Sequence, residues 1–375
     1  MTWIQNAPIT NKKRPLKTIN FSREAHQEFT KTLRYRVNEY FKSTNQSKFG
    51  NHKMAIKTVF MFSLYFVPYA ALYLFPQAPS WVIILLYMSM GLGVAGIGLN
   101  VMHDANHGVL SKNRFINALL SYSMNFIGSN AKIWRIQHNV LHHTFTNINH
   151  YDEDVENFPL LLRFSPNQKL RKIHRYQYLY AWFFYAQMTL ARVLMSDFTK
   201  LFSYKKKGLL KNNEFAKELF ILFFSKILYF VYIILIPYLV MDISIWTFVI
   251  GFVLMHQVAG LILALVFQLA HIKPELEFPE ADPNGNVQDS FLVHELKTTA
   301  NFGTESKFLT WFTGGLNFQI EHHLFTNICH IHYSGVSKIV RETTKEFNLP
   351  YHSEKSFLSA LINHYFMLKR LGYQN

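Results

Sequence analysis

The sequence predicts an all-α integral membrane protein with four transmembrane helices in two hairpins and a helical cytoplasmic cap. Half of the 375 residues are hydrophobic, yet the formal net charge is +15, so apolar and basic residues must occupy separate parts of the chain. The apolar residues gather into blocks long enough to cross a bilayer, which takes about 20 residues. Three histidine groups lie at or beyond the ends of these blocks. The chain therefore divides into a membrane part and a histidine-rich part that lies outside the bilayer.

Four apolar blocks form the predicted membrane part. They cover residues 55–75, 81–102, 219–241 and 245–271. Short connections without Lys or Arg, 76–80 and 242–244, join the blocks in pairs, which indicates two hairpins. Lys and Arg are frequent in the N-terminal, middle and C-terminal regions instead. By the positive-inside rule we expect a multi-pass protein with these regions, and both termini, in the cytoplasm.

The remaining segments follow from the same pattern. Two weaker, aromatic-rich blocks, 115–127 and 178–195, are too short or too interrupted to span and predict interfacial helices. No linker or low-complexity tract separates the cytoplasmic regions, so we expect them to pack as one cap. The expected order is an N-terminal cytoplasmic arm (1–54), a first transmembrane hairpin (55–102), a cap region with two histidine groups (103–218), a second hairpin (219–271) and a C-terminal cap region with the third group (272–375).

Composition excludes some classes of function. The basic residues flank apolar spans, and no nucleic-acid-binding motif is present, so the excess charge indicates a membrane surface or an acidic partner rather than nucleic acid. The chain has one cysteine, Cys329, so no intrachain disulfide can form. We interpret Cys329 as a small buried residue.

Three histidine groups fall on the predicted cytoplasmic side. They read His-Asp-Ala-Asn-His at 103–107, His-Asn-Val-Leu-His-His at 138–143 and Gln-Ile-Glu-His-His at 319–323. Histidines four residues apart lie on one face of a helix, so both histidines of the first group can reach one metal ion, and His138 and His142 repeat this spacing. His143 lies about 100° round the helix, which allows one helix to serve two ions. The candidate ligands are His103, His107, His138, His142, His143, Gln319, His322 and His323.

The residue types narrow the kind of metal site. Imidazole binds Fe, Zn, Cu and Ni, but a structural zinc site usually needs thiolates, and this chain has one cysteine. A zinc metalloprotease needs His-Glu-x-x-His, whereas the pair His294-Glu295 is followed by Thr298 where the second histidine belongs. Soluble di-iron oxygenases use Glu-x-x-His, which does not occur here. Clustered imidazoles are hard to keep compact and neutral without a cation. A histidine-rich dinuclear site at a membrane surface remains.

The three groups and their flanks resemble the membrane fatty acid desaturases. Gln319 at the head of the third group resembles the front-end type, which inserts a double bond between an existing one and the carboxyl end. The matching flanks are Thr146-Asn147, Asp152-Glu153-Asp154, Thr299-Ala-Asn301-Phe302, Gly314-Gly315-Leu316-Asn317-Phe318 and His330-Ile-His332-Tyr333. Each group alone is a weak pattern, but three in this order, with spans between the second and third, are specific.

The resemblance implies a metal-dependent reaction. It implies two Fe²⁺ ions and O2, which together introduce a cis double bond into a fatty acyl chain, with delta-5 or delta-6 position for the front-end type. It adds His271 to the ligand set, so the expected metal-binding and catalytic histidines are 103, 107, 138, 142, 143, 271, 322 and 323. It leaves open whether Gln319 binds metal directly or through water. Stearoyl-type relatives have histidine in place of Gln319 and asparagine in place of Phe267. In this chain Gln268 is the candidate to replace that asparagine.

Acidic residues close to the three groups are candidates to orient the imidazole rings. They are Asp104, Asp152, Asp154 and Glu321. Methylene groups offer no polar handle, so we expect an apolar tunnel to choose the position of the double bond.

The resemblance also implies partners outside this chain. The acyl substrate is carried as acyl-CoA, acyl-lipid or acyl carrier protein. Electrons come from a separate ferredoxin or cytochrome b5, because the His-Pro-Gly-Gly motif of a fused cytochrome b5 domain is missing. The nearest alternative is a membrane di-iron hydroxylase or ketolase of the same superfamily. A membrane metal transporter is the alternative from another class, although it would place its ligands near the bilayer midplane.

Overall fold

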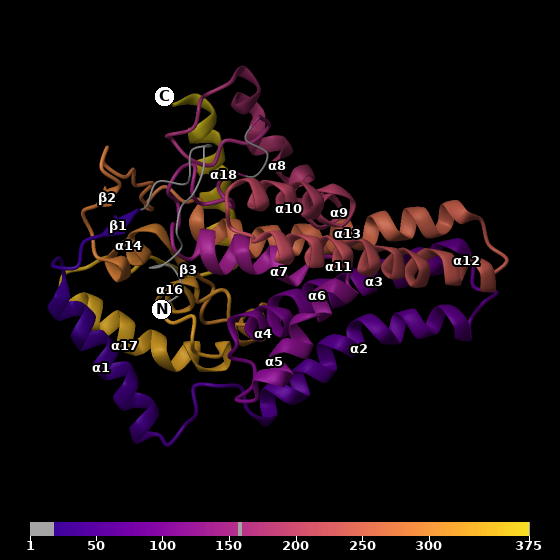
Figure 1. Ribbon diagram of the computed structural model, residues 1–375, viewed down its shortest axis with the longest axis horizontal. Helices are drawn as coiled ribbons and strands as arrows, with labels where there is room; N and C mark the ends of the chain where they lie inside the picture. Colours follow the sequence, from indigo (N-terminus) through magenta and orange to yellow (C-terminus); the bar gives the residue numbers. More distant parts are fainter. Residues whose placement is uncertain (1–18, 157–159, 375) are drawn as a thin grey trace.

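The computed structural model describes residues 19–156 and 160–374, so only residues 19–54 of the expected N-terminal arm are included. The described chain is mainly helical, with two small parallel sheets. Figure 1 shows the helices α2 (His52–Leu74), α3 (Ser80–Gly96), α11 (Asn212–Phe230), α12 (Ile236–Val240) and α13 (Ile245–His271) side by side at one end of the molecule. Helices α14 (Phe291–Thr298), α17 (Tyr333–Glu346) and α18 (Phe357–Tyr373) lie with α1 (Gln27–Ser43) and the small sheets toward the opposite end.

Within residues 19–156 and 160–374, four helices are long and apolar enough to cross a membrane, as predicted. The spans are α2 (His52–Leu74), α3 (Ser80–Gly96) continuing through η1 (Ile97–Met102) and α4 (His103–His107), α11 (Asn212–Phe230) continuing through η5 (Val231–Leu235) and α12 (Ile236–Val240), and α13 (Ile245–His271). The third begins seven residues before the predicted start at 219. Glu214 accepts a hydrogen bond from the Lys211 backbone N–H at 3.1 Å. This bond caps the helix, so the polar turn before the apolar block is helical too.

Close packing holds the second span against the first and the fourth. α3 packs against α13 along much of its length and against α2 on another side. Gly91 and Gly93 permit this approach, because an added Cβ would lie 2.5 Å from the Met255 carbonyl oxygen or 2.6 Å from the Tyr65 nitrogen. As a result, the histidine-bearing ends of the second and fourth spans, at His103 and His271, lie against the same segment, residues 136–143.

Short elements connect and cover the spans. Between the second and third spans lie α5 (Arg114–Ser121), α6 (Ser123–Phe126), α7 (Ala131–Arg135), η2 (Ile136–His142), η3 (Lys172–Tyr176), α8 (Gln177–Ala186), α9 (Met188–Ala191), η4 (Arg192–Ser196) and α10 (Asp197–Lys206). After the fourth come α14 (Phe291–Thr298), α15 (Lys307–Phe312), α16 (Gln319–Leu324), η6 (His330–His332), α17 (Tyr333–Glu346) and α18 (Phe357–Tyr373). The aromatic-rich blocks predicted as interfacial are each divided into short helices, and neither is among the described helices that are long and apolar enough to span.

The N-terminal segment packs onto the C-terminal region. Strand β1 (Asn20–Phe21) pairs in parallel with β2 (Asn286–Val287), and β3 (Asn301–Phe302) pairs with β4 (Ser353–Glu354). Helix α1 (Gln27–Ser43) lies against α17. The buried side chains of this contact form one apolar cluster that includes Phe29, Leu33, Val37, Val336 and Val340. Segments from both ends of the chain therefore share a core.

Candidate metal centre

Four separate segments bring the predicted histidines together. His103 and His107 lie on α4, at the end of the second span, and His271 is the last residue of α13. The second group lies on and directly after the π-helical turn η2, and the third lies on α16. All eight histidines are buried, except that His107 is partly exposed. The sequence separation between these segments is large, so only the fold unites them.

The imidazole nitrogens form two neighbouring sets. His103, His107, His138 and His322 form the first set, and His142, His271 and His323 form the second. Within each set the ligand nitrogens lie within 4.8 Å of one another. His143 groups with His322 of the first set and His323 of the second, so it lies between them. This is the arrangement expected for two adjacent metal sites, and the predicted histidines are those that the structure brings together.

The nitrogens inside these sets are turned toward one another without protein partners that would satisfy them. The Nε2 atoms of His103 and His138 lie 3.2 Å apart, and those of His138 and His143 lie 3.1 Å apart. Among the described residues, the following buried nitrogens have no hydrogen-bond partner: Nε2 of His107, His142, His271, His322 and His323. Leaving buried polar atoms unsatisfied costs about 1–3 kcal/mol each. Metal ions would satisfy them, and imidazole donors fit iron, zinc or copper.

The opposite ring nitrogens are held by protein groups. His142 Nδ1 lies 3.1 Å from both carboxylate oxygens of Asp152 and 3.5 Å from Asp154 Oδ2. His323 Nδ1 lies 2.7 Å from Glu295 Oε2. His322 Nδ1 lies 3.1 Å from the Tyr333 hydroxyl. Such contacts fix the ring orientation and leave Nε2 for a metal.

Two further Nδ1 atoms are oriented less tightly. His271 Nδ1 lies 3.3 Å from the Thr298 carbonyl oxygen, and His103 Nδ1 lies 3.4 Å from Asp104 Oδ1. Three of the four acidic residues predicted to orient the rings therefore contact histidines: Asp104, Asp152 and Asp154.

The expectation for Glu321 is wrong. Its carboxylate accepts hydrogen bonds from the Asn301 amide at 2.8 Å and the Tyr351 hydroxyl at 3.0 Å. Successive residues on a helix point about 100° apart, so Glu321 faces away from its neighbour His322. Glu295, which belongs to the incomplete protease motif His294-Glu295, contacts His323 instead. Its position on α14 gives no local signal, because the contact joins residues 28 positions apart.

The protonation of the buried histidines follows from their surroundings. Burial lowers the pKa of His138, His143 and His322 well below the usual range, and neighbouring histidines lower it further. These rings are neutral at pH 7, which is the form that binds metal. Burial also lowers the pKa of His142, but the Asp152 and Asp154 carboxylates outweigh this effect and raise it to about 9.

Gln319 is the first residue of α16 and is fully buried. Both polar atoms of its side chain lack a hydrogen-bond partner among the described residues. Gln268 lies one turn before His271 on α13. Its amide oxygen also has no hydrogen-bond partner among the residues that the structure describes. Neither amide has a described contact with a histidine, so direct ligation by Gln319 stays a prediction.

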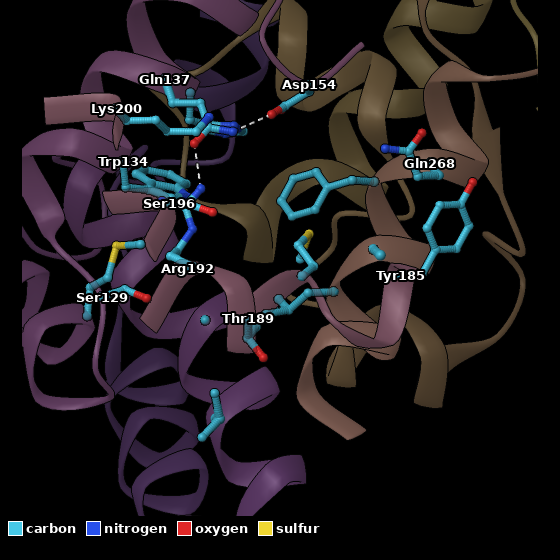
Figure 2. Close-up of a pocket in the computed structure, with 18 of the residues that line it drawn as sticks. Ser129, Trp134, Gln137, Asp154, Tyr185, Thr189, Arg192, Ser196, Lys200 and Gln268 are labelled. Carbon is cyan, nitrogen blue, oxygen red and sulfur yellow. Dashed lines mark hydrogen bonds between the residues drawn. The ribbon is translucent and has the colours of Figure 1, made fainter. Parts of the chain in front are cut away.

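A cavity lies next to the histidines. It runs between α3 and α13, where its apolar wall includes Val94, Gly98, Met102, Leu263 and Ala264. Of the eight candidate histidines, His138 is the one found among the described residues that line this cavity. Figure 2 shows the labelled polar residues Gln137, Asp154, Ser196, Arg192 and Lys200 gathered on one side of the cavity. The cavity thus combines an apolar channel with a polar side next to the histidine cluster.

Hydrogen bonds connect the polar side chains on this side of the cavity to one another. Arg192 donates to the Gln137 amide oxygen at 2.5 Å, and the Gln137 amide nitrogen donates to Asp154 Oδ1 at 2.6 Å (Figure 2). Lys200 donates to Glu153 Oε2 at 3.1 Å. Gln137 directly precedes His138, so the polar side of the cavity begins one residue from a candidate ligand.

Comparison with known proteins identifies the family. The family model for "Fatty acid desaturase" matches residues 79–355. An acyl-lipid (8-3)-desaturase from Physcomitrium patens is 32% identical over 95% of this chain and 74% of its own length. Two sn-1 linoleoyl-lipid 6-desaturases are similar: that of Arthrospira platensis is 32% identical over 92% of both chains, and that of Synechocystis sp. is 33% identical over 92% of this chain and 95% of its own. This chain therefore belongs to the fatty acid desaturase family, and it is an oxidoreductase that acts on fatty acyl substrates.

Proposed function

We propose that this protein is an oxygen-dependent front-end acyl-lipid desaturase with two histidine-bound iron ions. One observation carries the proposal: eight histidines from four distant segments converge as two adjacent sets, with their unpartnered nitrogens turned inward. His103, His107, His138 and His322 would hold one ion, and His142, His271 and His323 the other. His143 lies between the two sets and can serve either ion.

The reaction requires removal of hydrogen from an unactivated methylene, which no protein acid or base can achieve. The iron pair, when bound, supplies that oxidising chemistry, with O2 as the oxidant and external electrons from a ferredoxin or cytochrome b5. The protein's own contribution is to hold the ligands and the substrate. Asp152, Glu295 and Tyr333 orient the imidazoles, and burial keeps most of the rings neutral.

The cavity supports the assignment of its two ends to the two ends of the acyl chain. Gly98 and Val94 precede His103 by five and nine residues, so at 1.5 Å per residue they lie about 8 and 14 Å from it along the helix. The apolar wall there suits the methyl end of the chain. The polar side at Gln137 and Arg192 suits the carboxyl ester.

This assignment favours front-end regiochemistry. The polar side adjoins His138, so an ester held there leaves only a short stretch of chain between the carbonyl and the metal ions. An enzyme that counts from the methyl end would need the ester far from the ligands. The relatives named acyl-lipid (8-3)-desaturase and linoleoyl-lipid 6-desaturase agree with a delta-5 or delta-6 position and with a lipid-bound substrate.

The same proposal includes the membrane arrangement. The four spans form two hairpins, 55–102 and 219–271. The regions 1–54, 103–218 and 272–375 form the cytoplasmic cap, with both termini on that side. Two observations support this arrangement. The loops that connect the paired helices are short, and the N- and C-terminal segments share one apolar core.

Expression in a host with a simple lipid profile tests the activity. We expect new fatty acids two mass units lighter than their precursors, with the double bond on the carboxyl side of an existing one. His142→Ala and His322→Ala should abolish both product and bound iron. His52→Ala removes an exposed histidine and is the matched control. Products sixteen mass units heavier would indicate a hydroxylase, and zinc-loaded protein without acyl products would indicate a metal transporter.

A further inference from the structure

A buried polar row connects the metal centre to the first span. Lys57 Nζ, on α2, lies 2.8 Å from His330 Nε2. His330 Nδ1 lies 2.8 Å from Asp104 Oδ2, and the other oxygen of Asp104 faces His103 Nδ1 at 3.4 Å. The row therefore runs from a lysine of the membrane part, through a second histidine and a carboxylate, to a candidate metal ligand.

The donors and acceptors in this row allow only one arrangement for a charged lysine. An ammonium group can only donate, so His330 Nε2 accepts from Lys57. The proton of the neutral ring is then on Nδ1, which donates to Asp104. Asp104 Oδ1 is left to accept from His103 Nδ1–H. This arrangement leaves His103 Nε2 without a proton, as metal binding requires.

Because Lys57, His330 and Asp104 are buried, each relies on its neighbours in the row as hydrogen-bond partners. Lys57 is 5% exposed, Asp104 1% and His330 4%. Asp104 Oδ2 also accepts from the Cys329 thiol at 3.1 Å and from the His330 backbone N–H at 3.3 Å. The ammonium of Lys57 and the carboxylate of Asp104 balance each other's charge through the neutral ring of His330. Removal of the cation would leave a buried carboxylate without its counter-charge.

We propose that Lys57 and His330 are positioning residues that hold Asp104 as the acceptor for His103 and so strengthen metal binding. The inference rests on the proposed ligand role of His103 but not on the reaction that the metal performs. It also gives the buried thiol of Cys329 a role as a donor to Asp104. The row means that the packing of α2 contributes to the metal centre although α2 carries none of the eight histidines.

Pairs of disruptive and conservative variants test the proposal. Lys57→Met removes the cation, whereas Lys57→Arg keeps it. His330→Leu breaks the row, whereas His330→Gln keeps one acceptor and one donor. Lys53→Met is the matched control, because Lys53 is exposed one turn earlier on α2. The measurements are the bound iron as a function of free iron, the rate of iron loss to a chelator, and thermal unfolding in detergent.

Lys57→Met and His330→Leu should lower iron affinity on the order of 10- to 100-fold, the range seen for residues behind metal ligands. The two conservative variants should recover most of it, and Lys53→Met should match the wild type. Wild-type affinity in both disruptive variants would overturn the proposal, as would equal losses in each disruptive and conservative pair. If one lysine variant does not fold, the His330 pair decides alone. His103→Ala distinguishes the ligand role of His103 from the positioning role of Lys57. If His103→Ala keeps its iron affinity, the ligand role itself is contradicted. If His103→Ala loses iron affinity while Lys57→Met keeps it, only the positioning role is contradicted.

Discussion

The length of the acyl cavity should be set where α3 faces α13, and Gly98→Leu tests this. A Cβ at Gly98 would lie 3.3 Å from Leu263 Cδ2 and 3.7 Å from Leu263 Cδ1, so further side-chain atoms must enter the cavity that both residues line. Displacing two or three substrate methylenes at about 0.8 kcal/mol each costs about 2 kcal/mol. This corresponds to a roughly 30-fold loss of kcat/KM for long chains.

The assay is a competition between acyl lipids with 16 and 18 carbons, scored by the ratio of desaturated products. Gly98→Leu should shift this ratio toward the shorter chain while bound iron stays at the wild-type level. Leu92→Phe is the control, because Leu92 lies on the same helix but is 40% exposed on its outer surface. An unchanged ratio in folded, iron-loaded Gly98→Leu would refute the assignment of this end of the cavity to the methyl end.

Two further predictions concern carboxylates. Glu295→Gln should weaken iron binding on the order of 10-fold or more, because the amide is a poorer acceptor for His323 Nδ1–H; chelator titration measures this, and wild-type affinity would contradict the role of Glu295. Burial raises the pKa of Glu153, but Lys200 and Lys207 outweigh this effect and lower it from 4.5 to about 2. A lowered pKa stabilises the fold above pH 4.5, by on the order of 3 kcal/mol, and this contribution is lost as pH falls toward 2. Glu153→Gln should therefore lower the unfolding temperature at pH 7 and narrow its gap to the wild type on acidification; an equal gap at all pH values would count against this ion pair.

The sequence predicts the membrane part well because a span must satisfy its own backbone and bury apolar side chains. Each predicted block corresponds to a helix, and the fourth helix ends at His271 as predicted. The third helix begins earlier because a polar turn capped by Glu214 is helical without being apolar. Hydropathy detects the apolar residues and not the cap.

The histidine cluster is predictable for a different reason. Spacing on one helix, as for His138 and His142, indicates which side chains share a face, and this spacing needs no tertiary information. His271 has no such partner, so only the resemblance to a family indicated it. Ligand identity is therefore partly local and partly a property of the whole fold.

The groups that hold the ligands were harder to foresee. Asp152 lies ten residues after His142 and was expected, whereas Glu295 and Lys57 reach the site from other elements. The misassignment of Glu321 has the same origin, since proximity in sequence to His322 says little about direction on a helix. Contacts of this kind depend on tertiary packing, which a single sequence does not specify.

The iron content of the purified, iron-reconstituted chain tests the central claim most directly. We expect about two iron ions per chain, bound by histidine nitrogen and lost together with activity in His142→Ala or His322→Ala. A chain that binds only one ion, or that stays active and iron-loaded in either variant, would contradict the claim that the two histidine sets form a dinuclear iron centre.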